Sequence, residues 1–315
     1  MPSYLNPVQD KRAKKLSAAL REAVRNADYG NAKLIFHDYH SLLHVFGDKS
    51  KTRLLKARLW VWEAAIEARE FQEARKGLSI VLDRLNENTR GYLEILKLLT
   101  VLEIRAGNIQ LAGEHAKTVV QNITAIRTEK TRREFHEDFI DRIKQEVTIY
   151  LLREKQPKMM EPSFLENEAG KLVQKNTSVN DLIVMMGSAL PNSAKNFLLK
   201  IETEIRGGLP YYSAPQLPPP STPSANIDYG KIVKKSLARI MYPLICRPDT
   251  KAQRLYAKVG FSGLFGAGGI LAKVVAKALF DAGSGAIDIA VPMLATIVNE
   301  KLDKFCANTS TETIL

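Results

Sequence analysis

Apolar residues recur along the first part of the chain at the spacing of one helix face. A short motif of this kind occurs three times: an aromatic residue or Ile, then Ala three residues later, then apolar residues four and seven positions beyond the Ala. This spacing places all four side chains on one stripe, and the small Ala lets a neighbouring helix approach closely. The three copies are Tyr29-Ala32-Phe36-Tyr39, Phe71-Ala74-Leu78-Val81 and Ile109-Ala112-Ala116-Val119.

Each copy follows a turn signal and therefore predicts the second helix of a hairpin. The turns fall near 27–31, 68–70 and 106–108, and Gly107 suits the left-handed backbone that often ends a helix. The copies start 42 and then 38 residues apart. Self-similarity at such a period is typical of stacked helical hairpins, which serve as interaction scaffolds.

The turn and stripe resemble the tetratricopeptide-repeat family. The resemblance covers about residues 13–122 and is carried by Gly107-Asn108-Ile109-Gln110-Leu111-Ala112 and Arg69-Glu70-Phe71-Gln72-Glu73-Ala74. In that family a small-residue turn joins two helices, an aromatic residue opens the second, and Ala follows three residues later. The period here is longer than the family's roughly 34 residues. The turn Gly is absent from two copies, and no Pro closes the repeat. The resemblance implies a helical-hairpin array; a plain helical bundle is the alternative.

Charged and proline-rich segments follow this array. A highly charged helix is predicted over 128–155, and three further helices over 162–175, 178–190 and 192–206. The segment 207–227 contains six prolines and no charged residue. Proline fixes φ and lacks the backbone donor, so the pattern predicts a flexible linker. Pro215-Gln216-Leu217-Pro218 also fits a P-x-x-P motif that docks in aromatic grooves.

The C-terminal part combines a basic segment with a glycine-rich apolar hairpin. Residues 228–258 are basic and amphipathic, and 259–299 are rich in glycine and apolar residues. The hairpin has two interpretations: a small helical core, or a surface that docks on an anionic membrane or a second subunit. A phosphate-binding glycine loop is disfavoured because the G-x-G-x-x-G spacing is incomplete. The candidate docking residues are Phe261, Leu264, Phe265, Ile270, Leu271, Lys273, Val274, Val275 and Lys277.

The fold predicted from these patterns is all-α, with four successive parts. We expect a tetratricopeptide-repeat-like array over 1–155, additional helices packed on it over 156–206, a Pro-rich linker over 207–227, and a glycine-rich helical unit over 228–315. A chain of 315 residues agrees with about two domains.

The charge balance points to an acidic partner. The net charge is +12 and the isoelectric point is about 9.5, which favours nucleic acid, anionic lipid or an acidic protein surface. Helical repeats with a basic face would bind RNA or DNA through phosphate contacts. The candidate residues for nucleic acid or an acidic partner are Lys11, Arg12, Lys14, Lys15, Lys231, Lys234, Lys235 and Arg239.

Signals for catalysis are absent from the sequence. Three histidines, His37, His40 and His44, lie on one helix face at a spacing that suits a metal, but a partly exposed stripe explains them better. H-E-x-x-H, G-x-S-x-G and C-x-x-C do not occur. We therefore predict no enzyme, no metal and no cofactor.

The cysteine content bears on the cellular compartment. Cys246 and Cys306 are too few for a disulfide framework, so a reducing compartment is the default. No signal-peptide pattern and no apolar stretch of about 20 residues occurs. We predict a cytoplasmic protein with a peripheral membrane association.

These observations together predict a non-catalytic adaptor. Its array would bind a protein partner, and its C-terminal hairpin would dock on a membrane or mediate oligomerisation. The alternative function is a basic helical-repeat protein that binds RNA or DNA.

Overall fold

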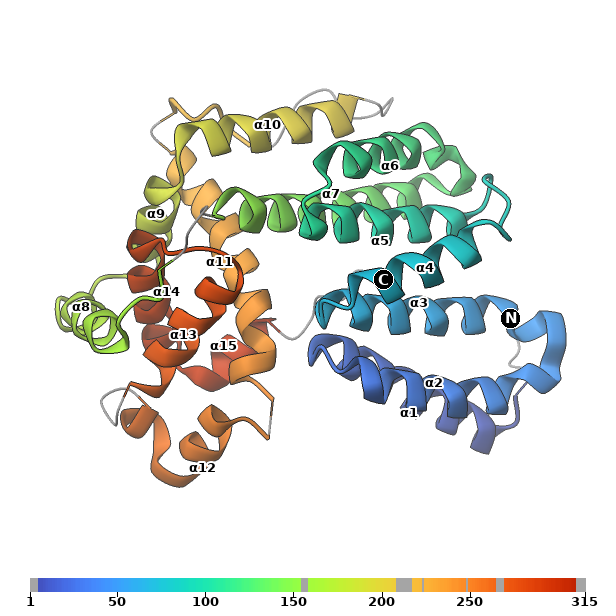
Figure 1. Ribbon diagram of the computed structural model, residues 1–315, viewed down its shortest axis with the longest axis horizontal. Coiled ribbons are helices and arrows are strands. Elements are labelled where there is room, and N and C mark those ends of the chain that lie inside the picture. Colours follow the sequence, from blue (N-terminus) through green and yellow to red (C-terminus); the bar gives the residue numbers. More distant parts are fainter. Residues whose placement is uncertain are drawn as a thin grey trace. The chain divides into compact units, whose positions relative to one another are not determined.

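The computed structural model describes residues 5–153, 158–207, 217–222, 224–247, 249–264 and 269–309, and these are helical without any strand (Figure 1). The all-α prediction is confirmed for them. The chain divides into two compact units between Phe139 and Ile140. This division lies inside one helix, whereas the sequence places a boundary in the Pro-rich segment.

The first unit is built from consecutive helices that pack on their neighbours. From α1 to α6 each helix contacts the next, α1 also contacts α3, and α3 contacts α5. Each of the three predicted stripes lies on one helix, and these helices begin at the first residue of the stripe: Tyr29, Phe71 and Ile109. The elements are α1 (Pro7–Arg25), α2 (Tyr29–Leu43), a 3₁₀ turn (His44–Ser50), α3 (Lys51–Glu67), α4 (Phe71–Leu82), α5 (Arg90–Ala106), α6 (Ile109–Gln121), a second 3₁₀ turn (Ile123–Ala125) and the start of α7 (Glu129–Leu151).

The three hairpin turns share one backbone conformation. Ala27, Arg69 and Gly107 each lie two residues before a stripe and have φ of 51°, 65° and 87°. The residue after each one donates its backbone N–H to the carbonyl five residues earlier, which satisfies the end of the preceding helix. These bonds run from Asp28 to Ala23 at 2.9 Å, from Glu70 to Ala65 at 2.8 Å and from Asn108 to Glu103 at 2.8 Å. The turn therefore repeats even where the sequence lacks glycine.

Substituting glycine at the first turn tests this shared geometry. Ala27→Gly is expected to raise the free energy of unfolding by about 0.5–1 kcal/mol, because glycine lacks the Cβ that makes left-handed backbone unfavourable. Gly107→Ala is expected to lower it by about 1 kcal/mol for the same reason. Urea unfolding followed by tryptophan emission reports both changes, since Trp60 and Trp62 lie in this unit. A loss of stability in Ala27→Gly would contradict the assignment.

A buried carboxylate connects the second and third hairpins. The Glu103 side chain is 1% exposed and accepts two hydrogen bonds from Arg75, at 2.7 and 2.8 Å, and one from Asn108 at 2.7 Å. Burial raises the pKa of the Glu103 carboxyl, but the hydrogen bonds from Arg75 and Asn108 outweigh it and leave the pKa below its ordinary value. The ion pair thus connects α4 with α5, and the hydrogen bond from Asn108 connects both with the turn that follows α5.

The second unit is centred on α11 and α14. Contacts join α11 with α9, α12, α13 and α15, and α14 with α8, α9, α13 and α15. The elements are α8 (Pro162–Gln174), α9 (Val179–Ala189), α10 (Asn192–Gly207), α11 (Ala225–Ile245), α12 (Lys251–Leu264), α13 (Ile270–Asp281), α14 (Ile287–Glu300) and α15 (Leu302–Thr309).

Two glycines let α9 and α11 meet backbone to backbone. A Cβ added to Gly187 would lie 1.9 Å from the carbonyl oxygen of Asn226, and one added to Gly230 would lie 1.9 Å from that of Ile183. Real Cβ atoms do not approach so closely, so no larger residue fits either position without a helix shift. The sequence analysis does not single out this pair, because only the fold brings the two positions together.

The end of the Pro-rich segment is bonded to the helices on either side of it. The backbone N–H of Leu217 donates to the fully buried Glu202 carboxylate at 2.9 Å. The hydroxyl of Tyr229 donates to the carbonyls of Pro218 at 3.1 Å and Lys195 at 3.2 Å. Residues 208–216 of the predicted linker lie outside the described residues. The described end is thus part of the second unit, together with α10 and α11.

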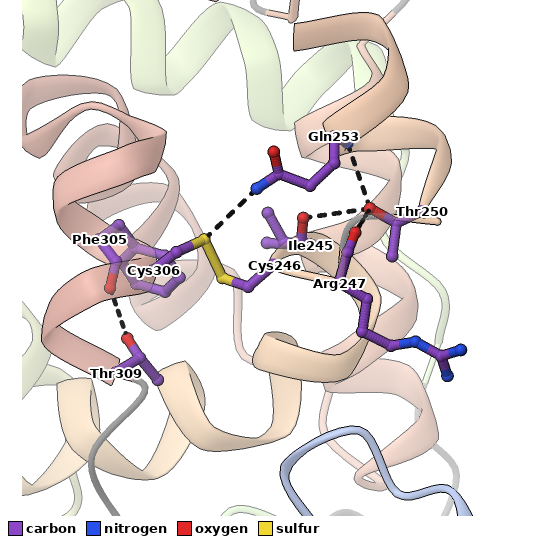
Figure 2. Close-up of a disulfide and its surroundings, with 8 residues drawn as sticks. All are labelled: Ile245, Cys246, Arg247, Thr250, Gln253, Phe305, Cys306 and Thr309. Carbon is purple, nitrogen blue, oxygen red and sulfur yellow. Dashed lines mark hydrogen bonds between the residues drawn. A yellow bond between two sulfur atoms is a disulfide. The ribbon is translucent and has the colours of Figure 1, made fainter. Parts of the chain in front are cut away.

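A disulfide closes the C-terminal part of this unit. Cys246, just after α11, bonds to Cys306 in α15, at a sequence separation of 60 and with 5.5 Å between their Cα atoms (Figure 2). The Gln253 side chain lies 3.8 Å from the Cys306 sulfur. The expectation of reduced, unpaired cysteines is corrected here: no local motif marks the pair, because only the fold brings these helix ends together.

Candidate functional site

A basic hollow opens on the first unit where α1, α2 and α3 meet. Its volume is about 280 Å³. Positions 14, 17 and 21 share one face of α1, and 53, 56 and 60 share one face of α3, so the two helices present matching rows. The lining residues are Ala13, Lys14, Ser17, Arg21, Tyr39, Arg53, Lys56 and Trp60. Four of them are cationic and none is acidic. We call this site the α1–α3 hollow.

Trp60 brings an aromatic ring and an unsatisfied donor to the hollow. The guanidinium of Arg21 lies 5.8 Å and the ammonium of Lys56 lies 5.4 Å from its ring centroid, within the range of cation–π attraction. Trp60 is 5% exposed, and its indole N–H has no acceptor in the part of the chain that the structure describes. A buried donor without a partner is unfavourable, and an acceptor that reached it would remove that cost.

The carboxylate of Asp10 pairs with two cations of the hollow. It lies 2.8 Å from the Lys14 ammonium and 3.6 Å from the Arg53 guanidinium. The hydrogen bond from Lys14 lowers the pKa of the Asp10 carboxyl against the raising effect of burial, and Arg53 lowers it further. The surroundings therefore stabilise an anion. Within the described residues, Arg21 and Lys56 have no carboxylate partner.

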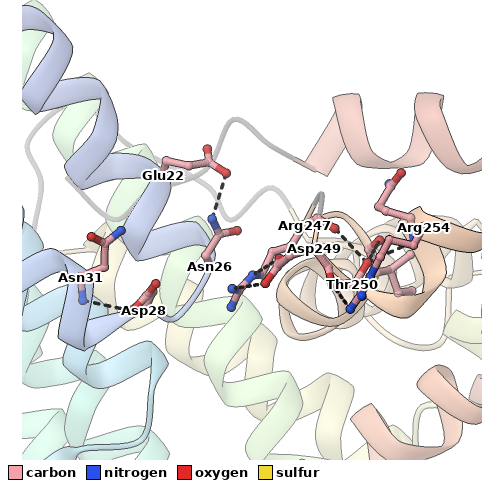
Figure 3. A network of polar contacts seen from close by, with 10 residues as sticks. Glu22, Asn26, Asp28, Asn31, Arg247, Asp249, Thr250 and Arg254 are labelled. Carbon is pink, nitrogen blue, oxygen red and sulfur yellow. Dashed lines mark hydrogen bonds and ion pairs between the residues drawn. The ribbon is translucent and has the colours of Figure 1, made fainter. Parts of the chain in front are cut away.

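Local hydrogen bonds fix both ends of α1 and hence the row that it contributes. The Asn6 side chain accepts from the Gln9 N–H at 2.9 Å while the Gln9 side chain accepts from the Asn6 N–H at 3.1 Å, which forms a capping box. At the other end Asn26 donates to Glu22 at 3.1 Å (Figure 3). Asp28 then accepts from the Asn31 N–H and starts α2 (Figure 3).

One of the four basic residues predicted on the first helix lines the hollow. Lys14 lines it, whereas Lys11, Arg12 and Lys15 are exposed on α1 outside the lining. Sequence reasoning did not single out Arg21, Arg53, Lys56 or Trp60 as a site. The spacing of three and four residues within each helix can be read from the sequence. The sequence does not show that these faces of α1 and α3 meet.

The second predicted basic cluster is compensated by nearby acids. Lys231 pairs with Asp228 at 3.3 Å, Lys235 lies 3.7 Å from Asp141, and Lys234 pairs with Glu300. Arg239 also has an interaction partner. These residues belong to the second unit.

The apolar residues proposed for docking are largely internal where they are described. Leu271 and Val275 are buried in the second unit, and Ile270 and Val274 are half-buried. Lys273 and Lys277 are exposed, and Lys277 pairs with Asp281 at 2.8 Å. Phe265 and the side chains of Phe261 and Leu264 lie outside the described residues. This burial agrees with the helical-core interpretation of the α13 stripe.

None of the described helices combines the length and apolar character needed to cross a bilayer. The three histidines are exposed: His37 and His40 lie on α2, and His44 begins the 3₁₀ turn that follows. The rings of His40 and His44 stack with centroids 5.4 Å apart. Partial burial lowers the pKa of His40, and His44, Arg58 and His37 lower it further. Over the described ranges, no three His, Cys, Asp or Glu side chains are grouped to hold a metal.

Comparison with known proteins adds no assignment to this geometry. No family model, curated protein or solved structure matches the chain. The tetratricopeptide-repeat resemblance therefore rests on the residues that carry it, and a function has to be argued from the α1–α3 hollow.

Proposed function

We propose that the protein is a non-catalytic adaptor whose N-terminal, tetratricopeptide-repeat-like unit binds an acidic segment of a protein partner in the α1–α3 hollow. The observation that carries the proposal is four cations converging on one hollow that has no acid in its lining. Cation–carboxylate pairs of this kind are charge-assisted hydrogen bonds that fix orientation as well as affinity.

A protein partner suits this hollow better than nucleic acid does. Binding of single strands relies on aromatic rings whose faces are open for base stacking. Here Trp60 is 5% and Tyr39 is 4% exposed, and cations already lie near the Trp60 ring. Nucleic acid remains the rival partner because the chain carries a net charge of +12. The proposal gives no docking role to α13, because its apolar face packs inside the second unit.

A charge-reversal pair tests the proposal in the full-length protein. Fluorescence anisotropy with a short, labelled Glu- and Asp-rich peptide gives the dissociation constant. Arg21→Glu with Lys56→Glu is expected to weaken binding by at least about tenfold, because the peptide then meets two anions in the hollow. Lys11→Glu with Lys15→Glu changes the net charge equally, at exposed positions of α1 outside the lining, and is expected to weaken binding by less than about threefold.

Two results would contradict the proposal. Equal losses in both pairs would mean that binding follows overall charge and not the hollow. Tighter binding of a single-stranded RNA of matched length, abolished by the hollow pair, would favour the nucleic-acid function.

A further inference from the structure

We infer that the α1–α3 hollow selects a phosphate monoester on a partner side chain, such as phosphoserine or phosphothreonine, over a carboxylate. The inference rests on the proposed function and names the group that the hollow recognises. It is carried by the charge, the donors and the size of the hollow.

The charge of the hollow exceeds what one carboxylate balances. Arg21 and Lys56 have no carboxylate partner within the described residues, so the lining keeps two cations that no carboxylate balances. A Glu or Asp side chain supplies one negative charge, whereas a phosphate monoester supplies about 1.5 to 2 near pH 7. The monoester therefore compensates more of the excess when both ligands occupy the same place.

The polar groups of the lining all provide donors. Arg21 and Arg53 carry guanidinium N–H groups, and Lys14 and Lys56 carry ammonium groups; Ser17, Tyr39 and Trp60 add hydroxyl and indole donors. These donors come from both sides of the hollow, since α1 and α3 each contribute a row. The three oxygens of a monoester can accept hydrogen bonds from both rows of donors, whereas a carboxylate has only two oxygens, which lie in one plane. The indole N–H of Trp60 has no acceptor in the described protein.

The size of the hollow favours a single side-chain group. About 280 Å³ lies at the small end of the roughly 300–1,000 Å³ typical of ligand pockets. One phosphorylated side chain is of that scale. A phosphodiester in a nucleic-acid backbone has one charge and two free oxygens, and it is flanked on both sides by nucleosides. The chemistry thus favours a terminal monoester over a diester.

The test compares three otherwise identical peptides with full-length protein. A short, labelled peptide with neutral flanks carries Ser, Glu or phosphoserine at its centre, and anisotropy is measured at fixed ionic strength. Phosphoserine is expected to bind at least about tenfold more tightly than Glu, and Ser to bind least. Inorganic phosphate is expected to displace the phosphopeptide from wild-type protein, whereas chloride at equal ionic strength is not.

Matched variants connect the selectivity to the hollow. Arg21→Gln with Lys56→Gln should reduce the preference for phosphoserine over Glu to less than about threefold, and Lys11→Gln with Lys15→Gln should leave it unchanged. Asp10→Asn should tighten phosphopeptide binding several-fold, because it removes a negative charge that competes with the ligand beside Lys14 and Arg53. Asp38→Asn changes an exposed carboxylate on α2 outside the lining and should have a smaller effect.

Each result separates this inference from the proposed function. Equal affinity for the Glu and phosphoserine peptides, lost in the Arg21/Lys56 variant, would overturn the phosphate selectivity and leave the acidic-segment adaptor standing. Failure of both peptides to bind wild-type protein would overturn both. A preference that survives in the Arg21/Lys56 variant, or wild-type peptide binding that inorganic phosphate does not compete, would place the phosphate site elsewhere and overturn the inference.

Discussion

Replacing Gly187 with alanine is expected to lower the free energy of unfolding of the second unit by about 3 kcal/mol or more. The new Cβ would lie 1.9 Å from the carbonyl oxygen of Asn226. Backbone cannot rotate aside as the end of a side chain can, so α9 and α11 must separate and loosen the core between them. Gly230→Ala is expected to act alike, because its Cβ would meet the carbonyl of Ile183 at the same distance.

Urea unfolding with two probes measures this effect. Far-UV circular dichroism follows helices throughout the chain, while emission from Trp60 and Trp62 follows the first unit. Gly187→Ala should shift the dichroism transition at a urea concentration where the emission is still native. The control is Gly113→Ala in α6, where an added Cβ has no atom within 4 Å. This change should be neutral or stabilising by about 0.5–1 kcal/mol. If Gly187→Ala unfolds at the same urea concentrations as the wild-type protein, the close approach of α9 and α11 is contradicted.

Removing the disulfide is the second change with a large expected effect. Cys246→Ser with Cys306→Ser is expected to lower the stability of the second unit by up to about 4 kcal/mol. The bond spans 60 residues, and the unfolded chain gains conformational freedom when that loop is released. The same dichroism assay measures the loss.

Reductant provides the internal control for this prediction. Wild-type protein in a thiol reductant should unfold like the double Ser variant, and the variant itself should not respond to reductant. Two reactive thiols found in denatured but unreduced protein would show that the bond is absent. Disulfides persist mainly in oxidising compartments. The bond therefore weighs against the cytoplasmic location that the low cysteine content suggested, and the location stays a prediction.

Local periodicity was enough to place the helices of the first unit. The stripes starting at Tyr29, Phe71 and Ile109 depend on residues three and four apart, and each begins a helix. Ala32, Ala74 and Ala112 are buried as their spacing predicts. The left-handed turns at Ala27 and Arg69 were not predictable from residue type, since neither residue favours that conformation.

Contacts between residues that are far apart in the sequence could not be predicted from the spacing of apolar and polar residues. The charge-free, proline-rich composition excluded helix and sheet, but it carried no sign that Leu217 would bond to Glu202. The disulfide and the α9–α11 glycines likewise depend on which helix ends and faces meet. The hollow is an intermediate case: Lys14 was predicted as a binding residue, but Arg21 and Lys56 gain their meaning only when α1 lies beside α3.

The bonds at the end of the Pro-rich segment have a consequence for chain continuity. Glu202 binds Leu217 and Tyr229 binds Lys195, while α9 and α11 touch through their glycines. Helices from both sides of 208–216 thus contribute to one core. A single peptide-bond cleavage in 208–216 would nick the protein without dividing it, and the two polypeptides would travel together until denaturant separates them. Two halves expressed separately would then be complementary parts, able to reassemble this unit from two chains.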